Sequence, residues 1–338
     1  MGLSKGPKAW LAEGLHSMRI FDRFDLGSLP WLPILNYHRI RPSNPSFATP
    51  FADGVFAGPT VDEFDRQMCW LSRRAEILSE DDLIAALRSG GAWTRPGVMV
   101  TFDDGYLDNY TLAFPILKHY RVPAIFFIPA GLTSSRRLGW WDLISYFIKR
   151  TGKSSLAVGG RRYQVAGTSS LVIQELMTRM RTEPAEQTQF LLQEISQAAG
   201  VAFPDPEMQS GELMTWDQIR EVEGGGITIG SHTLTHRVLS TLDSQAQEVE
   251  LRASKTLVET QIGRPVRSIA YPVGDYGDFN LETQRIAEGC GYELGFSFAT
   301  GVNRRTRLRP FDVKRVSAPA TTAFLAAKVK APLLFGSA

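Results

Sequence analysis

Short apolar segments alternate with amphipathic segments along most of the chain. The apolar segments have the length and the Gly/Pro boundaries of buried strands, and they cover residues 32–37, 97–102, 123–129, 226–231, 267–272 and 294–298. The amphipathic segments have helical spacing and cover residues 60–74, 107–120 and 243–263. Thr60 and Glu63 have the spacing of a capping box at the first of these helices. The alternation predicts an α/β fold, a barrel or an open sheet, with parallel strands and helices outside them.

One region interrupts this alternation. Residues 133–211 contain a long helical stretch whose apolar stripe includes Leu176, Met177 and Met180. We therefore predict an inserted helical subdomain rather than a linker. Inserted elements at strand exits commonly shape a substrate cleft.

Residues 1–31 are predicted to form a helical extension in front of the main domain, which covers residues 32–338. Its apolar residues would share one side of a helix: Trp10, Leu11, Leu15, Met18 and Ile20. Charges interrupt every apolar run, which disfavours a secretory signal peptide. A helix packed on its own domain is favoured over a membrane-surface anchor. We expect a cytoplasmic protein, with peripheral contact to the inner membrane as the alternative.

Composition sets limits on function without identifying one. The 338 residues carry a net charge of +2, and 43% are hydrophobic. That charge gives no argument for a nucleic-acid partner. No stretch approaches the roughly 20 apolar residues of a spanning helix. The two cysteines, Cys69 and Cys290, are expected to be reduced thiols of the core.

Two adjacent carboxylates end one of the predicted strands. Asp103 and Asp104 follow the apolar run 98–102, and Gly105 permits a sharp turn after them. Neighbouring side chains on an extended chain point to opposite faces, so the two carboxylates cannot easily share one partner. Alone, such a pair is typical of helix capping and turn formation.

Two of the five histidines lie four residues apart, directly after another predicted strand. On one helical turn or a tight loop, His232 and His236 would face the same way. Alternatively they are exposed residues at a helix start that Ser231 caps. Combined with the Asp pair, they predict a site for Zn²⁺ or a similar divalent ion, with one Asp as third ligand and the other free to act as a base.

A third stretch contains Tyr271, Pro272 and Gly274. A strand that ends in Tyr-Pro and then Gly forms a rigid turn that can present a backbone N–H to an oxyanion. Alone, Pro-x-Gly indicates only a turn.

The segments "TFDDGY", "SHTLTH" and "AYPVG", in this order, resemble the first three motifs of the polysaccharide deacetylases, the NodB-homology or carbohydrate esterase family 4 group. The resemblance covers about residues 32–132 and 212–316. It implies a distorted (β/α)7-type barrel interrupted by the insertion. It also implies metal-dependent hydrolysis of the N-acetyl groups of amino sugars.

The resemblance assigns roles to individual residues. It implies that Asp103 is the catalytic base and that Asp104, His232 and His236 bind one divalent ion, with zinc first and cobalt or nickel as alternatives. It places Tyr271 near the position whose backbone N–H binds the oxyanion. Substrate contacts are expected from Tyr106, Trp141, Tyr271, Pro272 and Arg315.

The chain departs from the family pattern at two points. Ala270 stands where many members have an Arg that holds the base, and Arg315 is a candidate substitute because a guanidinium can clamp a carboxylate with two hydrogen bonds. No histidine follows His236, so the usual C-terminal general acid is absent. His38 remains as candidate acid, with its ring expected in the cleft opposite Asp103 and kept cationic by a carboxylate. The alternative is a structural histidine.

Trp140 and Trp141 lie in the insertion. They are interpreted either as core residues or as residues that stack on a pyranose ring.

We expect an N-deacetylase that acts on an exopolysaccharide or cell-envelope glycan, or on its lipid-linked precursor. Two rival functions stay open. One is a metal-dependent amide hydrolase for a small non-sugar substrate, which a closed pocket would favour. The other is a glycan-binding relative that has lost turnover.

Overall fold

The computed structural model describes residues 8, 11–12, 14, 31–44, 49–51, 58–89, 97–299, 301–304 and 308–331. The predicted N-terminal helix therefore lies almost entirely outside the described residues. Among the helices that are described, none combines the length and apolar character that crossing a bilayer requires.

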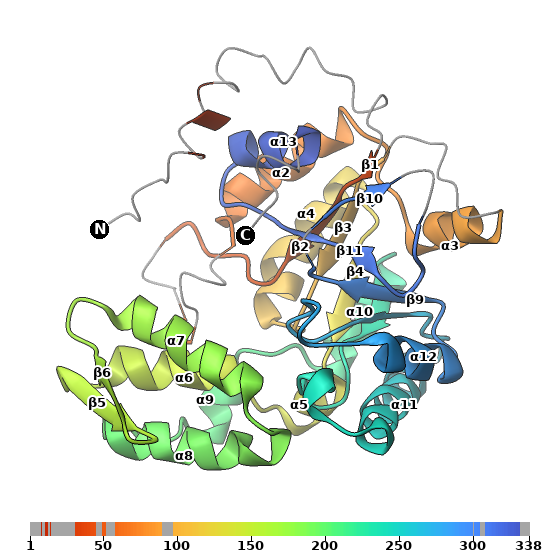
Figure 1. The fold of residues 1–338 in the computed structure, drawn as a ribbon. Coiled ribbons are helices and arrows are strands. Elements are labelled where there is room, and N and C mark those ends of the chain that lie inside the picture. Colours follow the sequence, from red (N-terminus) through yellow and green to blue (C-terminus); the bar gives the residue numbers. More distant parts are fainter. Residues whose placement is uncertain are drawn as a thin grey trace.

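Eight parallel strands form one sheet, which curves into a barrel (Figure 1). In the order of the sheet they are β11 (Val313–Lys314), β9 (Leu294–Ser297), β8 (Ser268–Ala270), β7 (Thr228–Ser231), β4 (Ile125–Ile128), β3 (Met99–Phe102), β2 (Ile34–Tyr37) and β12 (Val316–Ser317). Only Arg315 separates β11 from β12, yet β11 pairs with β9 and β12 pairs with β2. One extended segment thus joins both edges of the sheet, which confirms the distorted (β/α)7-type barrel.

Helices surround the barrel (Figure 1). They are α2 (Val61–Ser72), α3 (Glu80–Arg88), α4 (Phe114–Tyr120), α10 (Trp216–Gly224), α11 (Ser244–Ile262), α12 (Leu281–Gly289) and α13 (Thr322–Lys330). Thr60 caps α2 by accepting a hydrogen bond from the Glu63 N–H at 3.3 Å. The Glu63 carboxylate instead accepts a hydrogen bond from the Thr322 hydroxyl at 2.7 Å, so the predicted capping box is only half formed. Cys69 and Cys290 are free thiols; Cys290 is buried, whereas Cys69 is partly exposed.

Most of the segment between β4 and α10 forms a separate lobe, drawn in green in Figure 1. After α5 (Ala130–Ser135) it contains α6 (Trp140–Arg150), the hairpin β5 (Ser155–Val158) and β6 (Arg161–Gln164), α7 (Ser169–Thr182), α8 (Thr188–Ala199) and α9 (Pro206–Ser210). The lobe has its own hydrophobic cluster, which includes the predicted stripe Leu176, Met177 and Met180. The hairpin was not predicted, because its strands have only four residues each and β6 is mostly polar.

Candidate functional site

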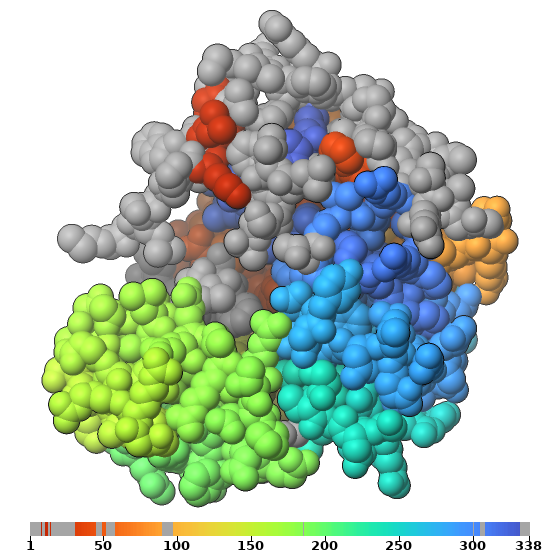
Figure 2. Space-filling view, viewed as in Figure 1, coloured from red at the N-terminus to blue at the C-terminus, as the bar shows by residue number. Residues whose placement is uncertain are grey.

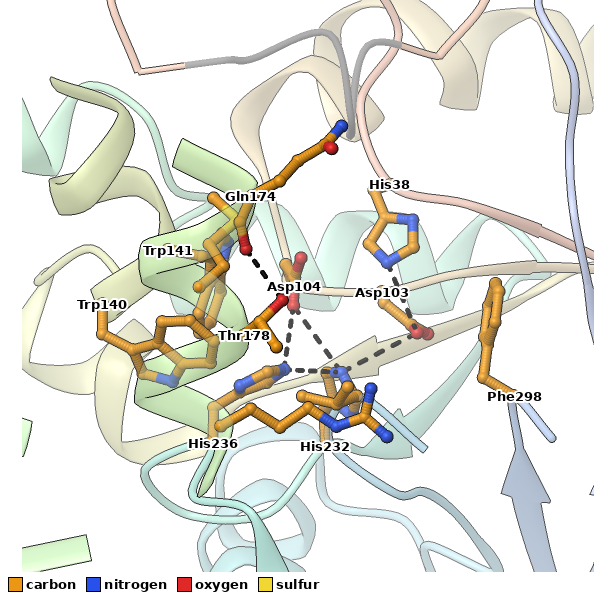
Figure 3. A pocket seen from close by; sticks show the side chains of 13 residues that line it. His38, Asp103, Asp104, Trp140, Trp141, Gln174, Thr178, His232, His236 and Phe298 are labelled. Atoms are coloured by element: carbon orange, nitrogen blue, oxygen red, sulfur yellow. Dashed lines mark hydrogen bonds and ion pairs between the residues drawn. The ribbon is translucent and has the colours of Figure 1, made fainter. Parts of the chain in front are cut away.

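A cavity of about 420 Å³ opens where the barrel strands end (Figure 3). Parallel strands bring their carboxyl ends to one rim, so residues that are distant in sequence meet there. The barrel contributes His38, Asp103, Asp104, His232, His236, Val273 and Phe298. The inserted lobe contributes Trp140, Trp141, Gln174, Met177, Thr178 and Arg181.

The turn after β3 separates the two adjacent carboxylates. The Asp103 N–H still donates to the Tyr37 carbonyl, at 3.0 Å, so Asp103 continues the strand. Asp104 and Gly105 follow in the left-handed conformation, with φ of 74° and 65°. Asp tolerates this conformation better than most residues, and Gly adopts it freely. The two carboxylates consequently face different partners.

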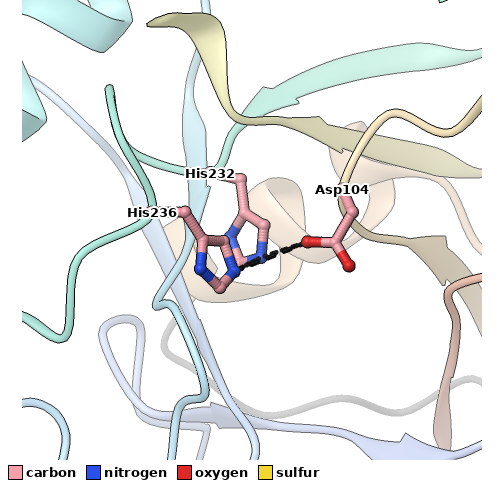
Figure 4. Close-up of side chains that lie close together, drawn as sticks. All are labelled: Asp104, His232 and His236. Carbon is pink, nitrogen blue, oxygen red and sulfur yellow. Dashed lines mark hydrogen bonds and ion pairs between the residues drawn. The ribbon is translucent and has the colours of Figure 1, made fainter. Parts of the chain in front are cut away.

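Asp104, His232 and His236 converge on one point (Figure 4). The two histidine Nε2 atoms lie 3.1 Å apart, and Asp104 Oδ1 lies 3.6 Å from that of His232 and 3.5 Å from that of His236. His232 Nδ1 lies 2.8 Å from the Ala270 carbonyl, which places its proton on Nδ1 and leaves Nε2 as a lone-pair donor. The histidines lie on a tight loop, in which His236 has a φ of 57°.

This donor set fits a divalent ion. Asp104 Oδ1 is buried and accepts no hydrogen bond from the described residues. Burial and the adjacent Asp103 raise the pKa of Asp104 well above its usual value, while burial and His232 lower the pKa of His236. Three ligand atoms at about 2.1 Å from one tetrahedral ion would lie about 3.4 Å apart, close to the spacing observed. A cation would therefore compensate a cluster that is otherwise electrostatically unfavourable.

Asp103 is buried beside the cluster and is held by two other side chains. Arg315 Nη1 donates to its Oδ1 at 2.7 Å, and Asn36 Nδ2 donates to its Oδ2 at 3.0 Å. Burial alone would raise the pKa of Asp103, but the Arg315 guanidinium outweighs it and holds the pKa well below its usual range. Asp103 is thus an ionised carboxylate. Its Oδ2 lies 3.7 Å from His232 Nε2.

Arg315 comes from the C-terminal part of the chain, yet its side chain lies against Asp103. This is the position expected if Arg315 replaces the Arg that many family members have where this chain has Ala270. It donates one hydrogen bond to Asp103 rather than two. Its side chain is 1% exposed and does not line the cavity. This position does not support the predicted contact of Arg315 with substrate, because its Nη1 donates instead to Asp103 and Asn36.

His38 lines the cavity, but the predicted side was wrong. Its Nε2 lies 4.0 Å from Asp103 Oδ2, so the two groups are neighbours rather than opposite (Figure 3). The reason is that β2 pairs directly with β3, so the residues after Tyr37 and Phe102 emerge side by side. Burial outweighs the attraction of Asp103 and lowers the pKa of His38 to about 4. The imidazole is therefore neutral near pH 7, contrary to the expected imidazolium.

Tyr271 and Pro272 do not occupy the positions expected for binding the oxyanion or contacting substrate. The Tyr271 N–H donates to the Phe296 carbonyl at 3.0 Å, and the side chain is buried in the core. Pro272 has no N–H, and neither residue lines the cavity. The next residue does line it: Val273 has a φ of 60°, strained for a β-branched residue, and its N–H has no hydrogen-bond acceptor among the described residues. The Pro-x-Gly turn was the signal for this donor, two residues after Tyr271.

Tyr106 and Trp141 connect the lobe to the barrel. The Tyr106 hydroxyl donates to Asp142 Oδ2 at 3.0 Å and accepts from Trp141 Nε1 at 2.7 Å. Tyr106 is buried outside the cavity, so its predicted contact with substrate is wrong. Trp141 is only 4% exposed, but its ring packs 4.1 Å from that of His236 and forms part of the cavity wall. No sequence pattern predicted that the Arg39 guanidinium would lie over the Tyr106 ring, 3.7 Å from its centroid.

Comparison with known proteins agrees with this geometry. A sequence model of the family "Polysaccharide deacetylase" matches residues 91–295. The chain is 26% identical over 275 residues to the putative polysaccharide deacetylase YxkH of Bacillus subtilis, covering 81% of this chain and 67% of the relative. It is 30% identical over 119 residues to poly-beta-1,6-N-acetyl-D-glucosamine N-deacetylases of Staphylococcus aureus, covering 33% of this chain and 40% of theirs.

Solved structures share the fold. The Streptococcus pyogenes deacetylase PplD, in complex with acetate, aligns with a TM-score of 0.57 at 21% identity, covering 91% of this chain and 99% of that one. IcaB from Ammonifex degensii aligns with a TM-score of 0.53 at 22% identity, covering 90% and 98%. The family model matches more than half of the chain, and the motifs it covers supply the converging side chains. The chain therefore belongs to the polysaccharide deacetylase family of hydrolases.

Proposed function

We propose that this protein is a metal-dependent hydrolase that removes N-acetyl groups from amino sugars of an exopolysaccharide or cell-envelope glycan, or of its lipid-linked precursor. The observation that carries the proposal is the buried Asp104, His232 and His236 cluster, with an ionised Asp103 beside it in one cavity. The names of the staphylococcal relatives, which act on N-acetylglucosamine polymers, support the choice of substrate.

The reaction needs a nucleophile, an acceptor for its proton and a donor for the developing oxyanion. A divalent ion held by Asp104, His232 and His236 would polarise the acetamide carbonyl and lower the pKa of a water; two imidazoles and a carboxylate suit zinc first. Asp103 accepts the proton of the attacking water, and Arg315 keeps its carboxylate oriented for that step. The Val273 N–H donates to the oxygen that becomes negative.

The departing amine also needs a proton. Asp103 holds one after the attack, and His38 is the adjacent titratable side chain, 4.0 Å away. We assign the return of this proton to Asp103, with the neutral His38 as the neighbour that relays it or orients the amine. This replaces the assignment of a cationic His38 on the leaving-group side.

The His38→Ala variant should retain its metal and lose about tenfold in kcat, below the range for a principal acid or base. Because the pKa of His38 is lowered to about 4, the residue is already neutral above pH 5 and does not titrate on the alkaline side. The alkaline limb of the pH–rate profile should therefore persist in the variant. Its disappearance would show that His38 acts as an imidazolium acid after all.

The Val273→Pro variant should lose about 10² to 10³ in kcat, the range measured when one oxyanion donor is removed. Proline lacks the N–H and cannot adopt a φ of 60°. Val273→Gly is the matched control, since Gly keeps the N–H and accepts this conformation. We expect Val273→Gly to stay within about tenfold of the parent. Equal losses in two folded, metal-loaded variants would mean that the Val273 side chain, not its N–H, matters.

The substrate class is tested by measuring acetate release. The metal-loaded protein should release acetate from N-acetylglucosamine oligomers and much less from acetylated amines that lack a sugar ring. The reverse preference would favour the small-substrate amide hydrolase. Oligomer binding without any acetate release would favour the glycan-binding relative.

A further inference from the structure

Helix α7 of the lobe forms one wall of the cavity. Gln174, Met177, Thr178 and Arg181 all line it, and their spacing places them on one helix face. The eight residues from Gln174 to Arg181 span about 12 Å of helix, so this face runs along the cavity rather than touching it at one point. In Figure 3, the labelled Gln174 and Thr178 lie beside Asp104, on the side away from Phe298.

The end of α7 is bonded to the barrel. Arg181 donates a hydrogen bond to Asp278 through Nε, and its Nη2 lies 3.5 Å from Asp275 Oδ2. Asp278 is 1% exposed and also accepts from the Asp275 N–H at 2.8 Å. Both carboxylates belong to the segment between β8 and α12 that carries Val273. The wall of the cavity thus continues from the lobe into the barrel, and Figure 2 shows the green and blue surfaces in contact.

A second side of the cavity is formed by Trp140. The same indole lines two neighbouring hollows, one among α5, α6, α8 and α9 and one beside Thr235 and Val238. It stands perpendicular to Trp141, with ring centroids 5.5 Å apart. Trp140 therefore separates the catalytic cavity from the space beyond it.

We propose that this cavity accepts a terminal amino sugar, at a glycan end or on a carrier, and excludes internal units of a long chain. The inference rests on the proposed deacetylase function and narrows its substrate. A volume of about 420 Å³ lies near the lower end for ligand pockets, and it suits one or two sugar rings. An internal unit extends in two directions. The Arg181 bridge and Trp140 both line the cavity, so they would flank a sugar ring placed over the metal cluster.

The test maps which unit of an oligomer loses its acetyl group. Hexamers of N-acetylglucosamine, β-1,4- and β-1,6-linked and isotope-labelled at the reducing end, are treated with metal-loaded protein and sequenced by mass spectrometry. A terminal unit should react at least about tenfold faster than any internal unit, the discrimination that a pocket wall provides. Equal rates at internal and terminal units would overturn the proposal.

Variants locate the cause of this selectivity. Arg181→Ala removes the bridge and should raise the share of internal products by about tenfold. Arg161→Ala is the matched control, because Arg161 pairs with Glu175 of the same helix but lies away from the cavity, with a side chain 65% exposed. The control should keep the terminal pattern. An unchanged pattern in a folded Arg181→Ala protein would overturn the role of the bridge.

A binding measurement separates this proposal from the proposed function. Asp103→Asn protein loaded with Zn²⁺ needs no turnover to bind oligomers. A terminal pocket predicts affinities for the dimer through the hexamer that agree within about threefold. If binding to the variant is independent of oligomer length but the parent protein releases no acetate, the proposed deacetylase function is wrong and the terminal pocket stands. Affinity that rises more than about tenfold with length would overturn the terminal pocket, whether or not acetate is released.

Discussion

Replacing His232 with Ala should remove most of the bound metal and nearly all turnover while the barrel stays folded. His232 Nε2 is one of three ligand atoms, and its ring is fixed by the Ala270 carbonyl. Altering residues that only support a metal ligand already costs 10- to 100-fold in metal affinity, so losing a ligand should cost more than about 100-fold. Metal content after dialysis and the rate of acetate release measure both effects.

The exposed His119 supplies the control for this experiment. His119→Ala removes the same ring from the last turn of α4, which does not line the cavity, and should change neither metal content nor rate. Circular dichroism of both variants checks the fold. A folded His232→Ala protein that is fully metallated and active would refute the proposed ligand set.

Replacing Asp103 with Asn should leave the metal bound and lower kcat by about 10² to 10⁴, the usual range for a positioned acid or base. The amide keeps the shape of the carboxylate and one acceptor for Arg315, but it cannot take a proton from water. The rate of acetate release is compared at equal metal content.

Asp104→Asn is the matched variant, since it makes the same chemical change in the adjacent residue. It should lose metal affinity, because Asp104 Oδ1 faces both histidines. If Asp103→Asn loses the metal and Asp104→Asn keeps it, the roles of the two residues are exchanged.

The site residues that could be predicted from sequence are those that directly follow a predicted strand. Asp103, Asp104 and the two histidines follow apolar runs, and parallel strands bring such exits together whatever the distance along the chain. The six longer strands of the barrel sheet were also predicted, because each is part of an apolar run. The closing segment was missed because β11 and β12 have two residues each and bracket a charged one.

The predictions that were wrong or incomplete depend on how distant segments of the chain pair, not on the residues of any one segment. The side on which His38 lies depends on β2 pairing with β3, which the residues of β2 alone do not reveal. Which N–H is free to serve as the proposed oxyanion donor depends on where the pairing of β8 with β9 ends, and Tyr271 is still hydrogen-bonded to Phe296. The Arg181 bridge joins residues almost 100 positions apart. Long-range pairing and burial decide each of these features.

We propose that a single divalent ion, held by Asp104, His232 and His236, drives hydrolysis with Asp103 as base. A metal titration of the chelator-treated protein tests this directly. Zn²⁺ is added in steps, and bound metal per chain and acetate released from N-acetylglucosamine oligomers are measured on the same samples. We predict that the rate rises in proportion to bound metal and saturates at one ion per chain, and that Asp103→Asn binds the same single ion almost without turnover. Undiminished acetate release by the metal-free protein would show that hydrolysis does not depend on this ion.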